Sequence, residues 1–229
     1  MKTALLVCDH VLPQFQGEHG GYPEMFGNLL PDIDLVSCFV CDGDFPDIEE
    51  FDSYVISGSK YSVYDNIPWI QELKDFTRKA YDAGKTVLGV CFGHQMIAEA
   101  LGGKVERDAN GIVIGVHEFE LLEKESWMEP YKSPYNMLML CQDQVTKLPS
   151  NSKILSKSRD CLIAMFALGD RFLGIQGHPE FTKEYNRAVF ESRSEIISRH
   201  KIDKAIESFV NEPDTSLLQR YLTGFLQRE

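Results

Sequence analysis

The segment Gly89-Val90-Cys91-Phe92-Gly93 places a cysteine between two glycines at the spacing of a nucleophile turn. An apolar run over residues 86–90 precedes the cysteine and a helical pattern follows it, so Cys91 lies where a strand meets a helix. Such a turn is tight, and small residues on either side let the neighbouring backbone approach. The partial positive charge of the helix N-terminus favours a thiolate, and the free N–H of Phe92 would face a developing oxyanion. The motif predicts a nucleophilic Cys91; the alternative is a buried structural cysteine.

A second chemical segment, Gly177-His178-Pro179-Glu180, follows an apolar run at residues 172–175. A thiol nucleophile needs a base, and histidine is the usual one. The base needs an orienting group, which a carboxylate two residues later supplies if the segment is extended. His178 and Glu180 are therefore the predicted base and orienter, although the tripeptide alone also fits an ordinary loop histidine.

A third segment, Ser57-Gly58-Ser59, ends the apolar run at residues 53–57. In a parallel sheet, ligands collect at the carboxyl ends of the strands. Gly58 permits close backbone approach, so its N–H is the predicted second donor to an oxyanion. The alternative for this segment is an ordinary glycine turn.

Taken together, these segments resemble the class I glutamine amidotransferases. The resemblance rests on Gly89-Val-Cys91-Phe-Gly-His-Gln95, His178-Pro-Glu180 and Ser57-Gly-Ser59. It is strongest to the freestanding branch related to the amidotransferase domain of GMP synthase, which includes the plant γ-glutamyl peptidases. Residues 20–26 and 65–69 also look like this branch, and the similarity spans about residues 4–181.

The resemblance implies a flavodoxin-like α/β fold and hydrolysis of a γ-glutamyl amide without a metal or organic cofactor. It implies a catalytic triad, two backbone donors that form an oxyanion hole, and three substrate-binding residues, of which the last two belong to a segment that helps hold the amino acid end of the substrate. In that order, these residues are Cys91, His178 and Glu180; Gly58 and Phe92; and Gln95, Gln142 and Asp143.

The chain departs from the family pattern in three ways. Family members commonly carry Gly-Gly-Pro where this chain has Ser57-Gly58-Ser59, which affects the geometry of the oxyanion loop. Many members have a histidine at the position of Cys141, which affects contacts to the substrate. There is no phosphate-binding G-x-x-x-x-G-K-[ST] loop, and we expect no ammonia-accepting synthetase domain in the remaining residues.

The elements that must position these residues alternate between strand and helix in the first half of the chain. This alternation predicts a mostly parallel central sheet flanked by helices. Short strands dominate from residue 105 onward. The expected strands are at residues 3–8, 35–40, 53–57, 86–90, 112–116, 118–122, 137–141, 161–168 and 172–175. The expected helices of the first half are a short one that follows Gly20-Gly21 and ends at Leu30, and two at residues 69–83 and 92–101.

The residues after Glu180 are predicted to be helical to the end of the chain. An apolar stripe recurs on one helical face there. The stripe consists of Leu217, Leu218, Tyr221, Leu222, Phe225 and Leu226. We expect a catalytic domain over residues 1–182 and a C-terminal helical extension over residues 183–229 packed on it; an oligomer contact is the alternative for the stripe.

The composition is that of a soluble globular protein, with 43% hydrophobic and 25% charged residues in a chain of 229. A net charge of −12 argues against nucleic acid as a partner. No signal peptide or membrane span is recognisable, so we expect a cytoplasmic protein. Of the six cysteines, Cys38 and Cys41 form a C-x-x-C in an expected strand, where they would point to opposite faces. We therefore predict two separate thiols there and no metal site.

Three functions remain open at this stage. The chain could be a glutaminase subunit that delivers ammonia to a separate synthetase, or a peptidase that cleaves γ-glutamyl conjugates such as glutathione derivatives. It could also be a regulatory binding module with a vestigial site. The presence of all three triad residues favours an enzyme that acts on a small molecule.

Overall fold

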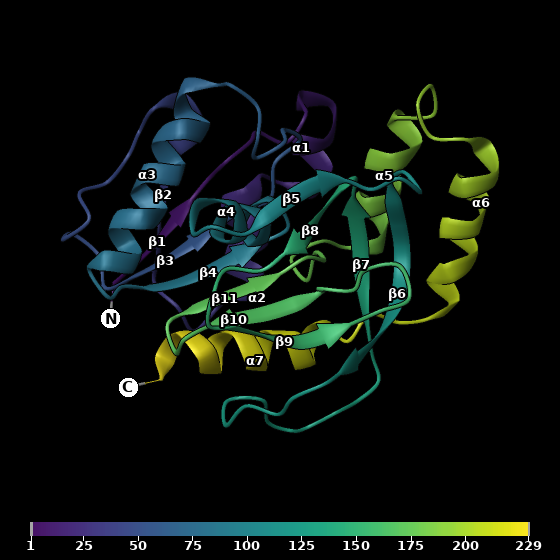
Figure 1. Ribbon diagram of the computed structural model, residues 1–229. Coiled ribbons are helices and arrows are strands. Elements are labelled where there is room, and N and C mark those ends of the chain that lie inside the picture. Colours follow the sequence, from purple (N-terminus) through teal and green to yellow (C-terminus); the bar gives the residue numbers. More distant parts are fainter. Residues whose placement is uncertain (1, 229) are drawn as a thin grey trace.

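A nine-stranded sheet runs through the molecule with helices on both faces (Figure 1). The structure, a computed structural model, describes residues 2–228. The strand order is β2-β1-β3-β4-β11-β10-β9-β6-β7, and β5 and β8 form a separate two-stranded sheet. The strands are β1 (Thr3–Leu6), β2 (Leu35–Cys38), β3 (Ser53–Ile56), β4 (Thr86–Val90), β5 (Lys104–Arg107), β6 (Val113–Leu121), β7 (Tyr135–Cys141), β8 (Asp143–Lys147), β9 (Ser152–Lys157), β10 (Met165–Leu168) and β11 (Phe172–Ile175).

The predicted α/β class is confirmed, and the large sheet is mixed. The strands β2, β1, β3, β4 and β11 run parallel to one another. Beyond β11 every pairing is antiparallel. The carboxyl ends of β1, β3, β4 and β11 therefore lie at one edge of the parallel part.

Helices cover both faces of this parallel part. The helices are α1 (Pro13–His19), α2 (Tyr22–Leu29), α3 (Pro68–Asp82), α4 (Phe92–Ala100), α5 (Lys183–Ser192), α6 (Arg199–Glu207) and α7 (Thr215–Gln227), with short 3-10 turns η1 (Val40–Asp42) and η2 (Ser208–Val210). One core lies between the sheet and α2, α5 and α7, and the other between the sheet and α3 and α4. Because β1, β3 and β4 are buried on both faces, their sequences are continuous apolar runs.

The helix α3 shows how the sequence specifies one of these layers. Pro68 stands at its first turn, where a missing N–H costs nothing. Ile70, Leu73, Phe76 and Ala80 recur every three or four residues and are all buried against the sheet. The predicted span of residues 69–83 is confirmed to within one residue at each end.

Several strand predictions need correction. Residues 112–116 and 118–122 belong to one continuous strand, β6, and the predicted strand at residues 161–168 begins only at Met165. The expected strand over residues 35–40 ends at Cys38, and Cys41 lies in η1. The strands β5, β8 and β9 and the helix α1 were not predicted, because their sequences carry many polar and charged residues and lack a clear apolar period.

The apolar stripe of the C-terminal segment packs within its own chain. All six of its residues are buried in the core on the face of the sheet that α2 also covers, and Figure 1 shows α7 (yellow) running beneath the strands. The predicted boundary between residues 182 and 183 falls at the start of α5, but the helices beyond it share the core of the sheet. The division into a domain and an extension therefore stays a prediction.

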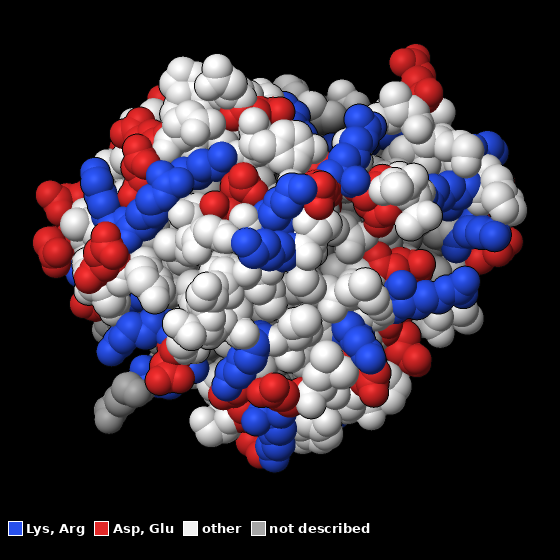
Figure 2. All heavy atoms as spheres, in the orientation of Figure 1, with Lys and Arg blue, Asp and Glu red and all other residues white. Residues whose placement is uncertain are grey.

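The charged side chains on one face of the molecule are shown in Figure 2. Acidic and basic groups lie next to one another around a largely uncharged area over the middle of the sheet. Within the described residues, none of the helices combines the length and the apolar character that crossing a bilayer requires.

Candidate active site

Cys91 stands in a turn whose backbone is strained. It lies between the end of β4 and the first residue of α4, with φ 52° and ψ −100°, a conformation that L-residues other than glycine rarely adopt. Two backbone hydrogen bonds fix the turn: the Cys91 N–H donates to the Ile175 carbonyl (2.8 Å), and the Gln95 N–H donates to the Cys91 carbonyl (3.1 Å). The predicted strand–nucleophile–helix turn is thus present.

The glycines that flank Cys91 are required by close backbone contacts. A Cβ atom on Gly89 would lie 2.3 Å from the Gly93 carbonyl oxygen, and one on Gly93 would lie 2.3 Å from the Ile56 carbonyl oxygen. No larger residue fits at either position without moving the backbone. The prediction that small residues permit this approach is confirmed.

Sheet register brings the three predicted segments together. Ile56 of β3 pairs with Gly89 of β4, and Val90 of β4 pairs with Ile175 of β11. Each strand therefore ends beside its neighbour, and the residues that follow meet at the carboxyl edge. A Cβ atom on Gly58 would lie 3.0 Å from His178 Cε1 and 3.8 Å from Cys91 Cβ, which places all three groups in contact range.

His178 is held on two sides. Its Nδ1 lies 2.7 Å from Glu180 Oε1, and both side chains are buried. The two residues face each other across a turn rather than along an extended segment, because the Phe181 N–H bonds back to the His178 carbonyl (3.4 Å). The ring of Phe181 stacks on the imidazole at 4.1 Å and 5°, which fixes the orientation of the His178 ring.

The electrostatics of His178 favour its protonated form. Burial alone lowers its pKa, but the negative charges of Cys91 and Glu180 outweigh burial and raise the pKa to about 10. The site can therefore hold His178 as an imidazolium between Cys91 and Glu180. The Leu140 carbonyl oxygen contacts both partners, at 3.3 Å from His178 Nε2 and 3.9 Å from Cys91 Sγ.

The two backbone groups predicted to bind an oxyanion are free. Among residues 2–228, neither the Gly58 N–H nor the Phe92 N–H donates to a protein acceptor. Phe92 is the first residue of α4, so its N–H is one of the unpaired donors at a helix N-terminus. Ser57 supports the oxyanion loop, because its Oγ accepts the Cys8 N–H at 2.9 Å and donates to the Gly58 carbonyl at 3.1 Å.

Gln95 lies in the site with its amide nitrogen already engaged. Its Nε2 donates to the Asp143 carbonyl (2.7 Å) and to Gln176 Oε1 (3.2 Å). Gln176 was missed in the sequence, although its Nε2 donates to Cys91 Sγ at 3.6 Å and its side chain is fully buried. Its position directly after β11 becomes informative only once the sheet register places β11 beside β4. The side-chain nitrogen of Gln95 thus holds protein groups in place.

Asp143 and Gln142 differ in how firmly they are held. The buried Asp143 carboxylate accepts hydrogen bonds from the Ser62 hydroxyl and from the Tyr64 hydroxyl (3.0 Å), both in the loop that begins at Gly58. Gln142 is partly exposed between β7 and β8, and its carbonyl accepts the Asp108 N–H at 2.9 Å. The loop after β3 thus joins the oxyanion segment to Asp143.

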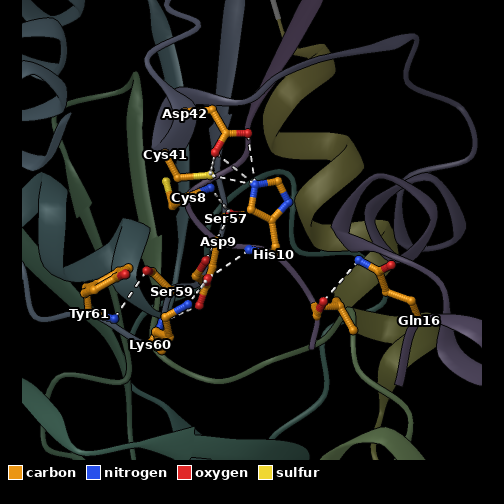
Figure 3. Close-up of polar contacts among 12 residues, drawn as sticks. Cys8, Asp9, His10, Gln16, Cys41, Asp42, Ser57, Ser59, Lys60 and Tyr61 are labelled. Carbon is orange, nitrogen blue, oxygen red and sulfur yellow. Dashed lines mark hydrogen bonds and ion pairs between the residues drawn. The ribbon is translucent and has the colours of Figure 1, made fainter. Parts of the chain in front are cut away.

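A cavity of about 220 Å³ opens beside His178. The rings of Tyr22, Phe181 and Tyr185 line it. Lys60 and Arg193 contribute positive charge, and Lys60 is held by the buried carboxylate of Asp9 at 2.8 Å (Figure 3). Asp9 also accepts the Lys60 N–H at 3.0 Å, so the loop after β1 supports the loop after β3.

These features match a known family. The family model described as glutamine amidotransferase class-I matches residues 36–194, which include every residue predicted for the site. The chain belongs to the class I glutamine amidotransferase family. This is a family of enzymes, and the sequence resemblance is thereby confirmed.

Individual relatives define the branch. Gamma-glutamyl peptidase 4 of Arabidopsis thaliana is 34% identical over 227 residues, which cover 92% of this chain and 89% of the relative. The GMP synthase of Streptococcus mutans serotype c is 30% identical over 161 residues, but these cover only 30% of that protein. A crystal structure of a glutamine amidotransferase from Thermotoga maritima has the same fold, with a TM-score of 0.76 at 20% identity and 99% of both chains covered.

Proposed function

We propose that this protein hydrolyses a γ-glutamyl amide bond through a thioester on Cys91. The observation that carries the proposal is the meeting of three elements at one edge of the sheet. The strained Cys91 lies with the buried His178–Glu180 pair and with two free backbone N–H groups. This arrangement supplies a nucleophile, a proton carrier with an orienter, and an oxyanion site.

In the proposed mechanism, the Cys91 thiolate attacks the γ-carbonyl carbon of the substrate. The N–H groups of Gly58 and Phe92 stabilise the oxyanion that forms. The His178 imidazolium gives its proton to the departing amine, and a γ-glutamyl thioester remains. His178 then takes a proton from water, the resulting hydroxide attacks the thioester, and glutamate and the Cys91 thiolate are released. Glu180 fixes the Nδ1–H tautomer of His178 throughout.

We assign the amino acid end of the substrate to Asp143 and Gln142, neither of which lines the cavity beside His178. The buried Asp143 carboxylate suits an α-ammonium group, and Gln142 stands next to it on the partly exposed connection between β7 and β8. We assign Gln95 a positioning role, because its amide nitrogen holds the Asp143 carbonyl and Gln176.

The cavity beside His178 favours a substrate whose leaving group is larger than ammonia. His178 protonates the departing amine, so the leaving group must occupy the space next to this ring. Aromatic side chains line that space, and Lys60 and Arg193 would attract a carboxylate. We therefore place γ-glutamyl peptides, as in the similar γ-glutamyl peptidases, ahead of free glutamine. The second candidate, a glutaminase subunit with a separate synthetase partner, is supported by the partial match to GMP synthase.

The test compares glutamine with γ-glutamyl dipeptides and glutathione conjugates, with glutamate release as the readout. Wild type should turn over γ-glutamyl peptides faster than glutamine, whereas a glutaminase subunit would prefer glutamine. Cys91→Ala should lower kcat by at least about 10⁴-fold while it leaves the fold intact, because the covalent step is lost. Mass spectrometry should detect the γ-glutamyl adduct on wild type during turnover. Substantial turnover by Cys91→Ala would overturn the proposal.

A further inference from the structure

Two segments of the chain, one of which contributes His10 to the cavity beside His178, bring an imidazole, a thiol and a carboxylate together (Figure 3). His10 follows β1, whereas Cys41 and Asp42 lie in η1 after β2. His10 Nε2 lies 3.0 Å from Asp42 Oδ1 and 3.7 Å from Cys41 Sγ. The distance from Cys41 Sγ to the same Asp42 oxygen is 3.9 Å. One donor atom from each residue therefore converges on a common point, all within 4.8 Å of one another.

This triangle has the size of one face of a zinc coordination tetrahedron. Zinc lies about 2.0–2.1 Å from a histidine nitrogen, about 2.3 Å from a cysteine sulfur and about 2.0–2.2 Å from a carboxylate oxygen. Tetrahedral angles between such bonds give ligand-to-ligand distances of about 3.3–3.6 Å. The three observed distances of 3.0, 3.7 and 3.9 Å depart from these values by amounts that small side-chain rotations can absorb.

We propose that His10, Cys41 and Asp42 bind one Zn²⁺ ion. A thiolate and an imidazole select zinc over magnesium or calcium, which prefer sites made of oxygen ligands alone. The side chains of His10 and Asp42 are about half exposed, at 51% and 56%, so water can supply the fourth ligand. A thiolate and a carboxylate together neutralise the two charges of the ion.

The backbone holds the three ligands in place without help from a metal. The Cys41 N–H donates to the Val7 carbonyl at 3.3 Å, which ties η1 to the end of β1. The Asp42 N–H donates to the Phe39 carbonyl at 2.9 Å, and this 3-10 turn points two consecutive side chains toward His10. The His10 ring stacks on Phe39 at 5.4 Å and 12°, so its orientation is set by packing.

The electrostatic surroundings favour a cation at this point. The Asp42 carboxylate lies 3.9 Å from Cys41 Sγ, and the Asp9 carboxylate accepts the His10 N–H at 2.8 Å, so negative charge surrounds the proposed ion. The nearest positive side chain on the neighbouring loop, Lys60, is paired with Asp9 at 2.8 Å. Because Lys60 pairs with Asp9, the Asp42 carboxylate can pair with His10 and bind the ion.

None of the three zinc ligands takes part in the proposed chemical steps, although His10 also lines the cavity beside His178. The zinc site is not a C-x-x-C metal site, because Cys38 is not one of the ligands. Cys38 ends β2, and its charged neighbours are Asp44, Glu50 and Lys2. Cys41 alone turns toward His10. The structure shows Cys38 and Cys41 as separate thiols, as the sequence predicts, and it places Cys41 beside His10, a residue far away in sequence.

The test measures zinc uptake in a Cys91→Ala background, so that the catalytic thiol cannot contribute. After removal of metal with a chelator, the protein should bind one equivalent of Zn²⁺, and an excess of Mg²⁺ should not displace it. Co²⁺ used as a probe should give a sulfur-to-cobalt charge-transfer band. Adding Cys41→Ser should abolish this band, and either Cys41→Ser or His10→Ala should weaken Zn²⁺ binding by more than about 100-fold.

Two matched variants serve as controls. Cys38→Ser removes the other cysteine of the C-x-x-C, and His200→Ala removes an exposed histidine on α6; both should retain one equivalent of Zn²⁺. Thermal unfolding without metal verifies that each variant is folded. The proposal is wrong if the Cys91→Ala protein takes up no Zn²⁺, or if folded Cys41→Ser and His10→Ala variants bind it as tightly as their parent. Because Cys91 is absent from every sample, the outcome is independent of the proposed hydrolase activity.

Discussion

At the scale of single residues, the charge on His178 links the geometry of the site to its pH dependence. Cys91 and Glu180 contribute negative charge close to a ring that burial alone would keep neutral. The imidazolium is the form that can protonate a departing amine. Because the pKa is raised to about 10, this form persists through neutral pH and is lost only as pH rises through that value.

Replacement of Glu180 tests this link. Glu180→Gln removes one of the charges that raise the pKa of His178, so the alkaline limb of kcat/KM should move to lower pH. The maximal rate should fall as well, because the glutamine amide can also bind the wrong tautomer of the His178 ring. In other triads, replacing the carboxylate by its amide costs about 10⁴-fold in kcat. The measurement is the pH profile of glutamate release by wild type and variant. An unchanged alkaline limb would assign it to a group other than His178.

The residues of the site differ in how visible they were in the sequence. Cys91, His178 and Gly58 stand in short motifs whose chemistry depends on residue type and spacing, so they could be named in advance. Gln176 and the Leu140 carbonyl could not, because one glutamine carries no motif and a carbonyl carries no residue identity. Both reach Cys91 only through strand register, which a single sequence does not specify.

At the scale of elements, the short loop after β11 is held between two anchored ends. β11 fixes Gln176 and His178, and α5 begins at Lys183, only a few residues later. The Thr182 side chain caps this helix by accepting the Tyr185 N–H at 3.1 Å. Tyr185 in turn packs edge-on against Phe181, the ring that stacks on His178. The cap therefore orders the aromatic rings beside His178, the proposed catalytic base.

Loss of the cap should cost stability. Thr182→Ala leaves one N–H at the first turn of α5 without its partner, so the free energy of unfolding should fall by about 1 kcal/mol. Thr182→Ser keeps the oxygen and should lose little. Urea unfolding of both variants at the pH of maximal stability gives the comparison. Equal losses in the two variants would show that the methyl group, rather than the hydrogen bond, matters at this position.

Elements were predictable where an apolar pattern matched one period. β4 and β11 were located without error and α3 to within one residue at each end, because buried parallel strands and an amphipathic helix have distinct patterns. The strands β5 and β8 were not predicted, because most of their side chains are polar and the two strands that pair are distant in sequence. The nine-stranded order depends on such distant pairings, so the sequence predicted some strands of the antiparallel part, but neither β9 nor the order of the strands.

At the scale of the whole molecule, the last helix packs in the same core as elements from the start of the chain. α7 lies beneath the parallel strands and shares a core with α2, although nearly the full length of the chain separates the two helices (Figure 1). Its Phe225 is fully buried and meets the Trp127 ring edge-on at 5.6 Å, which ties α7 to the loop between β6 and β7. The helix thus covers one face of the strands that position Cys91 and His178.

This arrangement predicts that α7 is an integral part of the fold. Phe225→Ala leaves a cavity in the shared core, so we expect the free energy of unfolding to fall by about 3–5 kcal/mol in a single cooperative transition. Leu162→Ala, at a side chain that is 70% exposed, should change it by less than about 0.5 kcal/mol. Urea titrations followed by tryptophan fluorescence and by circular dichroism should give coincident curves for both proteins. If Phe225→Ala instead produced two separate transitions, with the catalytic part unfolding at the wild-type midpoint, the residues from 183 onward would be an extension that folds by itself. A single lowered midpoint would mean that the helices and the catalytic sheet stabilise each other as one unit.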